Sequence, residues 1–179
     1  MQRRKFITST AAGAAFMVTK GLAFPTGIKK AFVVKNKQSR FNEQTNVGGS
    51  VDIKVSTKDT GGTLSIFEYT STTKGGPPLH IHLYQDEIFF IQQGDYIFQV
   101  GDEKHKLTDG CTIFLPRNVP HAFAQVTETG KLFYLFNPAG KMEDFFRTLG
   151  AIKGIPAPAV AAKIFEDHDM KIVGPPLLF

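Results

Sequence analysis

Short apolar-rich segments, the first of them with alternating apolar and polar residues, recur through the middle of the chain. In residues 51–57 apolar and polar side chains alternate, which is the period of a half-buried strand. Comparable segments follow, separated by turn-forming pairs such as Gly94-Asp95; they are 63–70, 79–83, 87–92, 96–100, 104–107, 112–115, 122–126 and 132–136. Many short strands at regular spacing predict an all-β sandwich or barrel, here over residues 51–140.

The apolar period changes after residue 140. Four apolar residues from Met142 to Leu149 recur at i, i+3, i+4 and i+7, which predicts a helix with one apolar face. A second helix is predicted over 158–168, and both helices are expected to pack outside the barrel. The Gly-Pro-Pro sequence at 174–176 is expected to end regular structure. Residues 141–179 are therefore a predicted C-terminal helical tail.

Residues 1–23 resemble a twin-arginine export signal. Arg3 and Arg4 precede a short Ala-rich apolar stretch and a small-x-small cleavage candidate at 21–23. The stretch is shorter than the roughly 20 residues of a permanent membrane helix, and no cysteine lies near for a lipid anchor. We therefore expect a periplasmic or secreted protein without a membrane anchor; the alternative is an amphipathic N-terminal helix.

Residues 24–50 do not continue the strand pattern. A short apolar run at 31–34 is followed by a polar, turn-rich stretch that ends in Gly48-Gly49. This segment is predicted to be an N-terminal arm. It packs either on the barrel or on a second subunit, and in the second case the protein is a homodimer.

Composition and charge remove several classes of function. The formal net charge of the 179 residues is +5, but without residues 1–23 the chain has 17 basic and 16 acidic residues. The basicity belongs largely to the export signal, so nothing indicates nucleic-acid binding. The single cysteine, Cys111, excludes an intrachain disulfide, and its apolar surroundings predict a buried, inert thiol.

Three histidines and one glutamate have the spacing of a transition-metal site. His80 and His82 lie on one face of a strand, with Cα atoms about 6.6 Å apart. The odd step to Glu87 requires a turn around residues 84–86, and the Tyr-Gln-Asp sequence there suits one. His121 follows in a later strand region. Imidazole and carboxylate ligands together suit one divalent ion of Fe, Mn, Ni, Co, Cu or Zn.

A lone histidine is more often an ordinary core or surface residue, so the flanking pattern matters. These flanks resemble the two motifs of the cupin superfamily. The first motif matches Gly75, His80, His82, Glu87 and Gly94. The second matches Gly110, Pro116, Asn118, His121 and Gln125. Asn118 stands where the motif usually has glycine, and Gln125 stands where it usually has asparagine. Asn tolerates a positive φ better than most residues, so the turn before His121 can survive.

The resemblance implies a double-stranded β-helix, or jelly-roll barrel, with C-terminal helices. It also implies that His80, His82, Glu87 and His121 are the metal ligands. Stretches similar to KVSTKDTGG and FNPAGKMEDFF make small quercetin-dioxygenase-like cupins the subtype it most resembles. In those enzymes the glutamate also acts as a base, so Glu87 is the expected catalytic residue.

The strand period places further side chains in the expected small-molecule pocket. Phe89 and Ile91 follow Glu87 on its face, and Phe123 and Gln125 follow His121. A mostly apolar pocket beside a metal suits a dioxygenase acting on a small phenolic or enolisable substrate. A metal-dependent isomerase or lyase and a non-catalytic ligand-binding protein remain open, because a fold does not determine a reaction.

Three other polar residues are expected outside the metal site. His105 lies in a charged strand and His168 ends an acidic run, so both are predicted to face solvent. Arg117 precedes the turn of the second motif. It is interpreted as a surface residue, with contact to an anionic substrate at the pocket mouth as the alternative.

Overall fold

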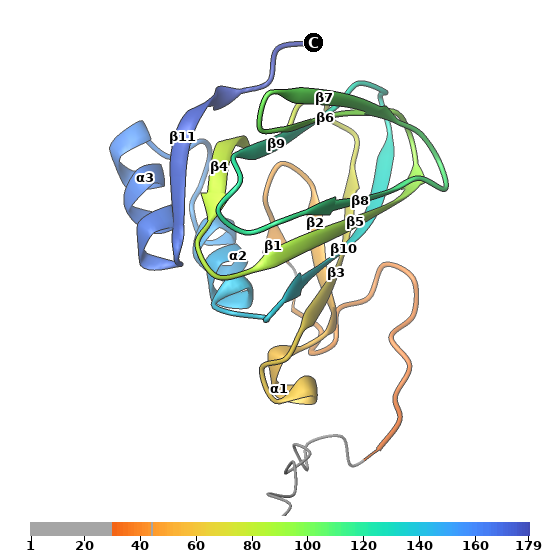
Figure 1. Cartoon of the computed structure of the whole chain (residues 1–179). Helices are drawn as coiled ribbons and strands as arrows, with labels where there is room; N and C mark the ends of the chain where they lie inside the picture. Colours follow the sequence, from red (N-terminus) through yellow and green to blue (C-terminus); the bar gives the residue numbers. More distant parts are fainter. Residues whose placement is uncertain (1–29, 44) are drawn as a thin grey trace, which may run out of the picture.

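The computed structural model describes residues 30–43 and 45–179, and its strands form two antiparallel sheets (Figure 1). The predicted export signal lies outside these residues. The six-stranded sheet has the order β1 (Thr45–Asn46), β2 (Ser50–Val55), β3 (Ser65–Ser71), β10 (Gly130–Asn137), β5 (Asp86–Gln93) and β8 (Thr112–Leu115). The five-stranded sheet has the order β11 (Met170–Pro176), β4 (Pro78–His82), β9 (His121–Gln125), β6 (Tyr96–Val100) and β7 (Glu103–Leu107).

The two sheets enclose an aromatic core. Alternate residues of each strand point inward because successive side chains in a strand face opposite sides. Tyr134 lies near the centre and stacks on Phe67 and Phe89, with ring centroids 5.3 and 5.2 Å away. Phe98 and Phe123 from the five-stranded sheet continue the cluster. The all-β jelly-roll prediction is therefore confirmed.

The N-terminal arm packs on the outer face of the six-stranded sheet. Lys54 on β2 donates from Nζ to the carbonyl oxygens of Lys35 and Gln38 and forms an ion pair with Glu68 at 3.2 Å. This corrects the prediction of a half-buried strand at 51–57, because the arm also covers the outward Lys54, which is only 8% exposed. The strand also ends earlier than predicted, since α1 begins at Thr57.

Two strands were not predicted, β1 in the arm and β11 in the C-terminal tail. Residues 170–176 were expected to leave regular structure, but they form β11, which pairs with β4 through Met170 opposite His82. The prediction was wrong because the Gly-Pro-Pro sequence was interpreted as a breaker. Proline is tolerated on an edge strand, where one side needs no hydrogen bonds. The C-terminal tail therefore adds a strand to the sheet that carries His80, His82 and His121.

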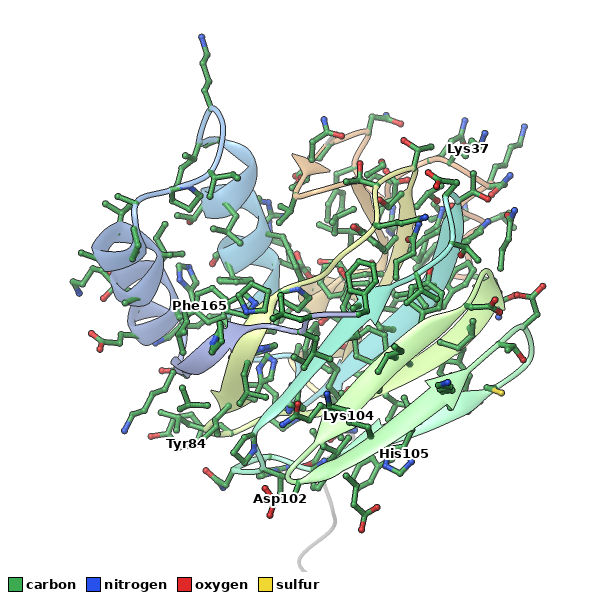
Figure 2. The ribbon with its side chains drawn as sticks, turned by 90° about the horizontal axis from the view of Figure 1, so that it is seen from above. Lys37, Tyr84, Asp102, Lys104, His105 and Phe165 are labelled. Carbon is green, nitrogen blue, oxygen red and sulfur yellow. The ribbon has the colours of Figure 1, made fainter. Side chains whose placement is uncertain are left out.

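Three helices complete the described part of the chain. They are α1 (Thr57–Thr60), α2 (Met142–Gly150) and α3 (Pro158–Asp167). α3 lies beside β11, and α2 packs against α3 and β1 (Figure 1). Phe165 lies on the side of α3 that faces the barrel (Figure 2) and packs edge-on against Phe145 of α2, 4.9 Å between ring centroids. Among the described residues, none of these helices has the length and apolar character needed to cross a membrane.

Candidate metal centre

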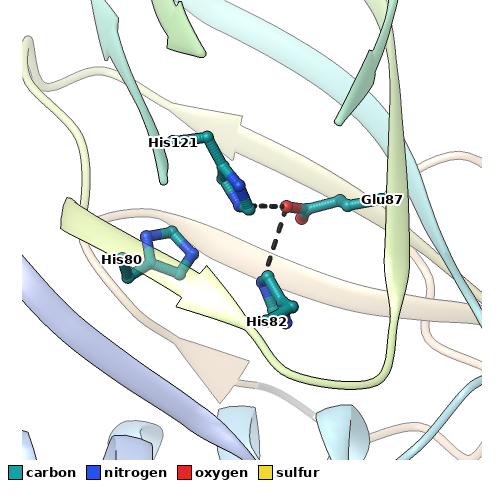
Figure 3. Close-up of side chains that lie close together, drawn as sticks. All are labelled: His80, His82, Glu87 and His121. Carbon is teal, nitrogen blue, oxygen red and sulfur yellow. Dashed lines mark ion pairs between the residues drawn. The ribbon is translucent and has the colours of Figure 1, made fainter. Parts of the chain in front are cut away.

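The structure brings His80, His82, Glu87 and His121 together inside the barrel. His80 lies directly opposite His121 in the pairing of β4 with β9, so two imidazoles from separate strands meet on one face. Glu87 comes from β5 in the other sheet and points inward toward them (Figure 3). The bend at residues 83–85 reverses the chain between the sheets, as the odd spacing requires. The site therefore bridges the two layers.

One ligand atom from each of these four residues can be chosen so that all lie within 4.8 Å of one another. Oε2 of Glu87 is 3.3 Å from Nε2 of His121 and 3.6 Å from Nε2 of His82 (Figure 3). Metal bonds to nitrogen or oxygen of about 2.1 Å place adjacent ligand atoms about 3.0 to 3.4 Å apart. The observed spacings are close to these values, so a small inward movement would complete a coordination sphere.

Backbone carbonyls orient two of the three imidazoles. Nδ1 of His80 donates to the carbonyl oxygen of Pro78 at 2.8 Å, and Nδ1 of His121 donates to that of Val119 at 2.9 Å. A carbonyl can only accept, so each Nδ1 carries the proton and each Nε2 keeps its lone pair. The positive φ of Asn118, +64°, supports the turn that places Val119 there, as the sequence predicts.

Burial makes the charged forms of these side chains unfavourable. Burial, with a smaller contribution from His121, lowers the pKa of His80 to about 3. Burial and the two neighbouring imidazoles hold the pKa of His82 well below its usual value. Burial raises the pKa of Glu87, while nearby His121 lowers it by less. His80 and His82 are therefore neutral at physiological pH, which is the form that binds metals.

A divalent metal ion fits this donor set. Nε2 of His121 is buried and has no hydrogen-bond partner among the described residues, although the Glu87 carboxylate lies 3.3 Å away. With the proton on Nδ1, an imidazole lone pair and a carboxylate oxygen face each other and repel. Buried polar atoms without partners are rare and require an explanation. A cation between them satisfies both atoms, and the mixed imidazole and carboxylate set suits a transition metal.

Aromatic rings surround the cluster on the side of the helices. Phe165 of α3 packs edge-on against His80, with 5.5 Å between ring centroids, and Phe136 lies 5.2 Å from His82. All four candidate ligands are at most 7% exposed. Phe165 was not predicted to lie here, because helical periodicity shows which residues share a face but not what that face contacts.

The four residues predicted to line a pocket all face the barrel interior or its core cluster. Phe89 and Phe123 lie two residues beyond Glu87 and His121, and their rings are 5.5 Å apart. Ile91 and Gln125 lie about 13 Å along their strands from those same ligands. Gln125 also has hydrogen-bond partners of its own, since its Oε1 accepts from Tyr96 at 3.4 Å. Their contact with a substrate stays a prediction.

Two cavities described in the structure lie away from the cluster. One, of about 420 Å³, opens between β7 and β8 and is lined by His105 among others. The second, of about 440 Å³, lies beneath the arm and is lined by Phe32, Lys54 and Phe133 among others. No member of the metal-site cluster lines either cavity.

The other candidate residues lie outside the cluster. His105 is on edge strand β7, remote from α3 (Figure 2), and pairs with Glu103 at 3.5 Å. His168 is half-buried rather than solvated, because its Nδ1 bonds the carbonyl oxygen of Ile164 and its ring packs on Phe145. Arg117 forms a two-pronged ion pair with Asp86 at the surface.

Comparison with known proteins agrees with the fold. Residues 68–136 match the family model described as "Cupin domain". An uncharacterized protein of Streptomyces coelicolor is 30% identical over 54 residues, which are 30% of this chain and 51% of that protein. The chain thus spans about half the length of this curated relative.

Two solved structures share the architecture. KdgF from Halomonas sp. is 18% identical with a TM-score of 0.54, over 64% of this chain and 98% of that chain. An RmlC-like cupin from Shewanella frigidimarina is 23% identical with a TM-score of 0.52, over 65% and 96% of the two chains. At these identities the likeness shows the fold alone. The match of residues 68–136 to the Cupin domain model agrees with the two-sheet topology and with the buried cluster of three histidines and one glutamate.

Proposed function

We propose that this protein is a metal-dependent dioxygenase that acts on a small phenolic or enolisable compound. The observation that carries the proposal is the convergence of three imidazole lone pairs and one carboxylate on a single buried point. Four protein ligands leave two positions open on a six-coordinate ion. That number suits a substrate oxygen together with O₂, whereas a tetrahedral ion would be saturated.

A divalent transition metal held by His80, His82, Glu87 and His121 would supply Lewis acidity and a binding place for O₂. The histidines hold their lone pairs inward because Nδ1 of His80 and of His121 is committed to a backbone carbonyl. The surrounding rings of Phe136 and Phe165 exclude water from the same point. The protein therefore contributes orientation and a dry environment.

Glu87 is the proposed catalytic base. A carboxylate oxygen of Glu87 takes the proton of the substrate hydroxyl, and the substrate becomes a phenolate or enolate. Burial raises the pKa of Glu87, which makes its carboxylate a stronger base than an exposed one. A cation held at the site would oppose this effect. The rings of Phe89 and Phe123 form the nearest apolar wall for the substrate.

Two alternatives use the same residues. A metal-dependent isomerase or lyase needs the base Glu87 and the Lewis acid but no O₂. A non-catalytic protein would bind a small ligand at the same residues without turnover. Oxygen consumption separates the dioxygenase from both.

Metal content tests the site. We expect the purified protein to contain about one transition-metal ion per chain and His82→Ala to lose most of it, because a missing ligand leaves a vacancy that water fills less tightly. His105→Ala is the matched control, since it removes a histidine outside the cluster, and it should keep its metal. Full occupancy in His82→Ala, measured by elemental analysis, would contradict the ligand assignment.

Oxygen uptake tests the reaction. Flavonols and enolisable diketones are incubated with the metal-loaded protein in an oxygen electrode. We expect substrate-dependent O₂ consumption that Glu87→Gln reduces strongly. Product formation without O₂ would support the isomerase or lyase. A ligand-dependent rise in melting temperature without turnover would support the binding protein.

We also propose that the protein is exported through the twin-arginine route to the periplasm. The proposal rests on Arg3, Arg4 and the short apolar stretch after them, and this route carries proteins that have already folded around a cofactor. Replacing both arginines with lysine should hold the protein in the cytoplasm, while Lys5→Arg should leave export intact. Unchanged periplasmic protein in the double variant, measured by cell fractionation, would refute the proposal.

A further inference from the structure

Two of the three site histidines have a backbone acceptor for Nδ1, but the third does not. Nδ1 of His82 is buried and has no hydrogen-bond partner among the described residues. The same is true of the side-chain oxygen Oε1 of Gln85, three residues later. Such a pair is unusual, since a buried donor or acceptor without a hydrogen-bond partner lowers the stability of the folded protein. Here one of each kind lies three residues apart in the sequence.

Gln85 lies in the bend between β4 and β5 and is only 2% exposed. Its amide packs against the backbone of Gly140, where a Cβ atom would come within 2.1 Å of Nε2. Gly140 also has a φ of +55°, which favours glycine. The absence of a side chain at residue 140 therefore leaves the room that the Gln85 amide fills.

The Gln85 side chain lies within reach of the His82 ring. Burial and the two neighbouring imidazoles lower the pKa of His82, and the Gln85 side chain acts in the opposite direction. An oxygen that accepts from the ring has this effect, because it stabilises the protonated nitrogen. The amide is therefore near the ring, although not in the geometry of an ordinary hydrogen bond.

The other acceptor within reach of His82 is Glu87. Nε2 of His82 is 3.6 Å from Oε2 of Glu87. If the proton of the neutral ring moved to Nε2, His82 would donate to Glu87, and Nε2 of His82 could not then bind a metal. A competing acceptor at Nδ1 prevents this tautomer, and metal-bound histidines ordinarily have such a partner.

We propose that Gln85 is a positioning residue, whose Oε1 accepts the Nδ1 proton of His82 and so keeps the Nε2 lone pair directed at the metal site. A small rotation of the amide completes the hydrogen bond. With it, all three imidazoles have the same tautomer, two through backbone carbonyls and one through this side chain. The inference rests on the proposed metal site.

The test compares Gln85→Met, which keeps the length of the side chain but removes the acceptor, with Gln85→Glu, which keeps an acceptor. Affinity is measured for Zn²⁺ and Co²⁺ by competition with a chromogenic chelator. We expect Gln85→Met to bind about 10- to 100-fold more weakly and Gln85→Glu to bind at least as tightly as the wild type. Gln99→Met, at a half-buried position on the outer face of β6, is the control and should bind normally.

A second measurement is independent of metal binding. In the metal-free protein labelled with ¹⁵N-histidine, two-bond ¹⁵N–¹H correlations identify the protonated ring nitrogen. We expect His82 to be protonated at Nδ1 in the wild type and to shift toward Nε2 in Gln85→Met, while His80 and His121 stay unchanged. A general loss of structure would alter all three rings, and thermal melting of each metal-free variant detects it directly.

Three results would overturn the proposal. They are wild-type affinity in Gln85→Met, an unchanged His82 tautomer in that variant, and an affinity of Gln85→Glu as weak as that of Gln85→Met. If Gln85→Met does not fold, the proposal is still tested with Gln85→Glu, by its affinity for the metal ion and by the tautomer of its His82. Failure of the wild type to bind either ion would refute the metal site, whereas the tautomer measurement would still test Gln85.

Discussion

Acidification should destabilise the metal-free protein well above the pH at which carboxylates titrate. The pKa of His80 is about 3 in the folded protein because the ring is buried, and it is about 6.5 in an unfolded chain. Above pH 6.5 the ring is neutral in both states and contributes no difference. As the pH falls from 6.5 toward 3, only the unfolded state takes up the proton, so stability falls with pH.

The size of the effect follows from the two pKa values. The unfolded state gains about 1.4 kcal/mol at pH 5.5 and about 2.7 kcal/mol at pH 4.5 from His80 alone. His82 acts in the same direction, because its pKa is also held low by burial. Glu87 acts in the opposite direction, because burial raises its pKa, so the drop between pH 7.5 and 5.5 is assigned to His80 by comparison with a variant that lacks its ring.

Urea denaturation of chelator-treated protein measures this free energy at each pH. The matched variant His80→Gln has no titrating ring at this position, so its stability should fall less steeply over the same interval. The wild type and variant curves should differ in slope, not only in height. If stability is flat from pH 7.5 to 5.5, or if His80→Gln has the wild-type slope, the histidine is not buried in its neutral form.

Two further predictions concern packing. Lys54→Met removes the buried ion-pair partner of Glu68 and should lower the free energy of unfolding by about 3 kcal/mol. Trypsin should also cleave the arm faster in this variant. Removing the charge of Glu68 as well should restore part of the lost stability. Phe67→Ala leaves a cavity at a fully buried position that contacts three aromatic rings. It should lower the free energy of unfolding, measured by urea denaturation, by about 3 to 5 kcal/mol. Phe114→Ala, at a site 55% exposed, should cost far less, and equal losses would contradict the described core.

Local patterns predicted most of the strands. The predicted boundaries of 96–100 and 112–115 coincide with β6 and β8, because the apolar residues and the turn residues that mark these strands lie within or next to each segment. The helix predicted from Met142 agrees with α2 for the same reason. β11 was missed because its Gly-Pro-Pro end contradicts strand propensity, and its edge position, which makes proline acceptable, depends on β4.

The candidate ligands could also be identified from sequence, but their surroundings could not. His80 and His82 share a strand face, so their proximity follows from spacing alone. Gln85 gave no signal, since its residue type suits the turn in which it lies. Its relation to His82 depends on the space that Gly140 leaves, 55 residues later in the chain.

The amino-acid order thus determined the strand periods, the face shared by His80 and His82, and the residue types that can hold a metal. Those properties depend on neighbours a few positions apart. The distance from Glu87 to His121, the burial of Lys54 beneath the arm and the place of Phe165 beside His80 were decided by how the two sheets close and what covers them. Contacts between distant segments set these features, and no local period encodes such contacts.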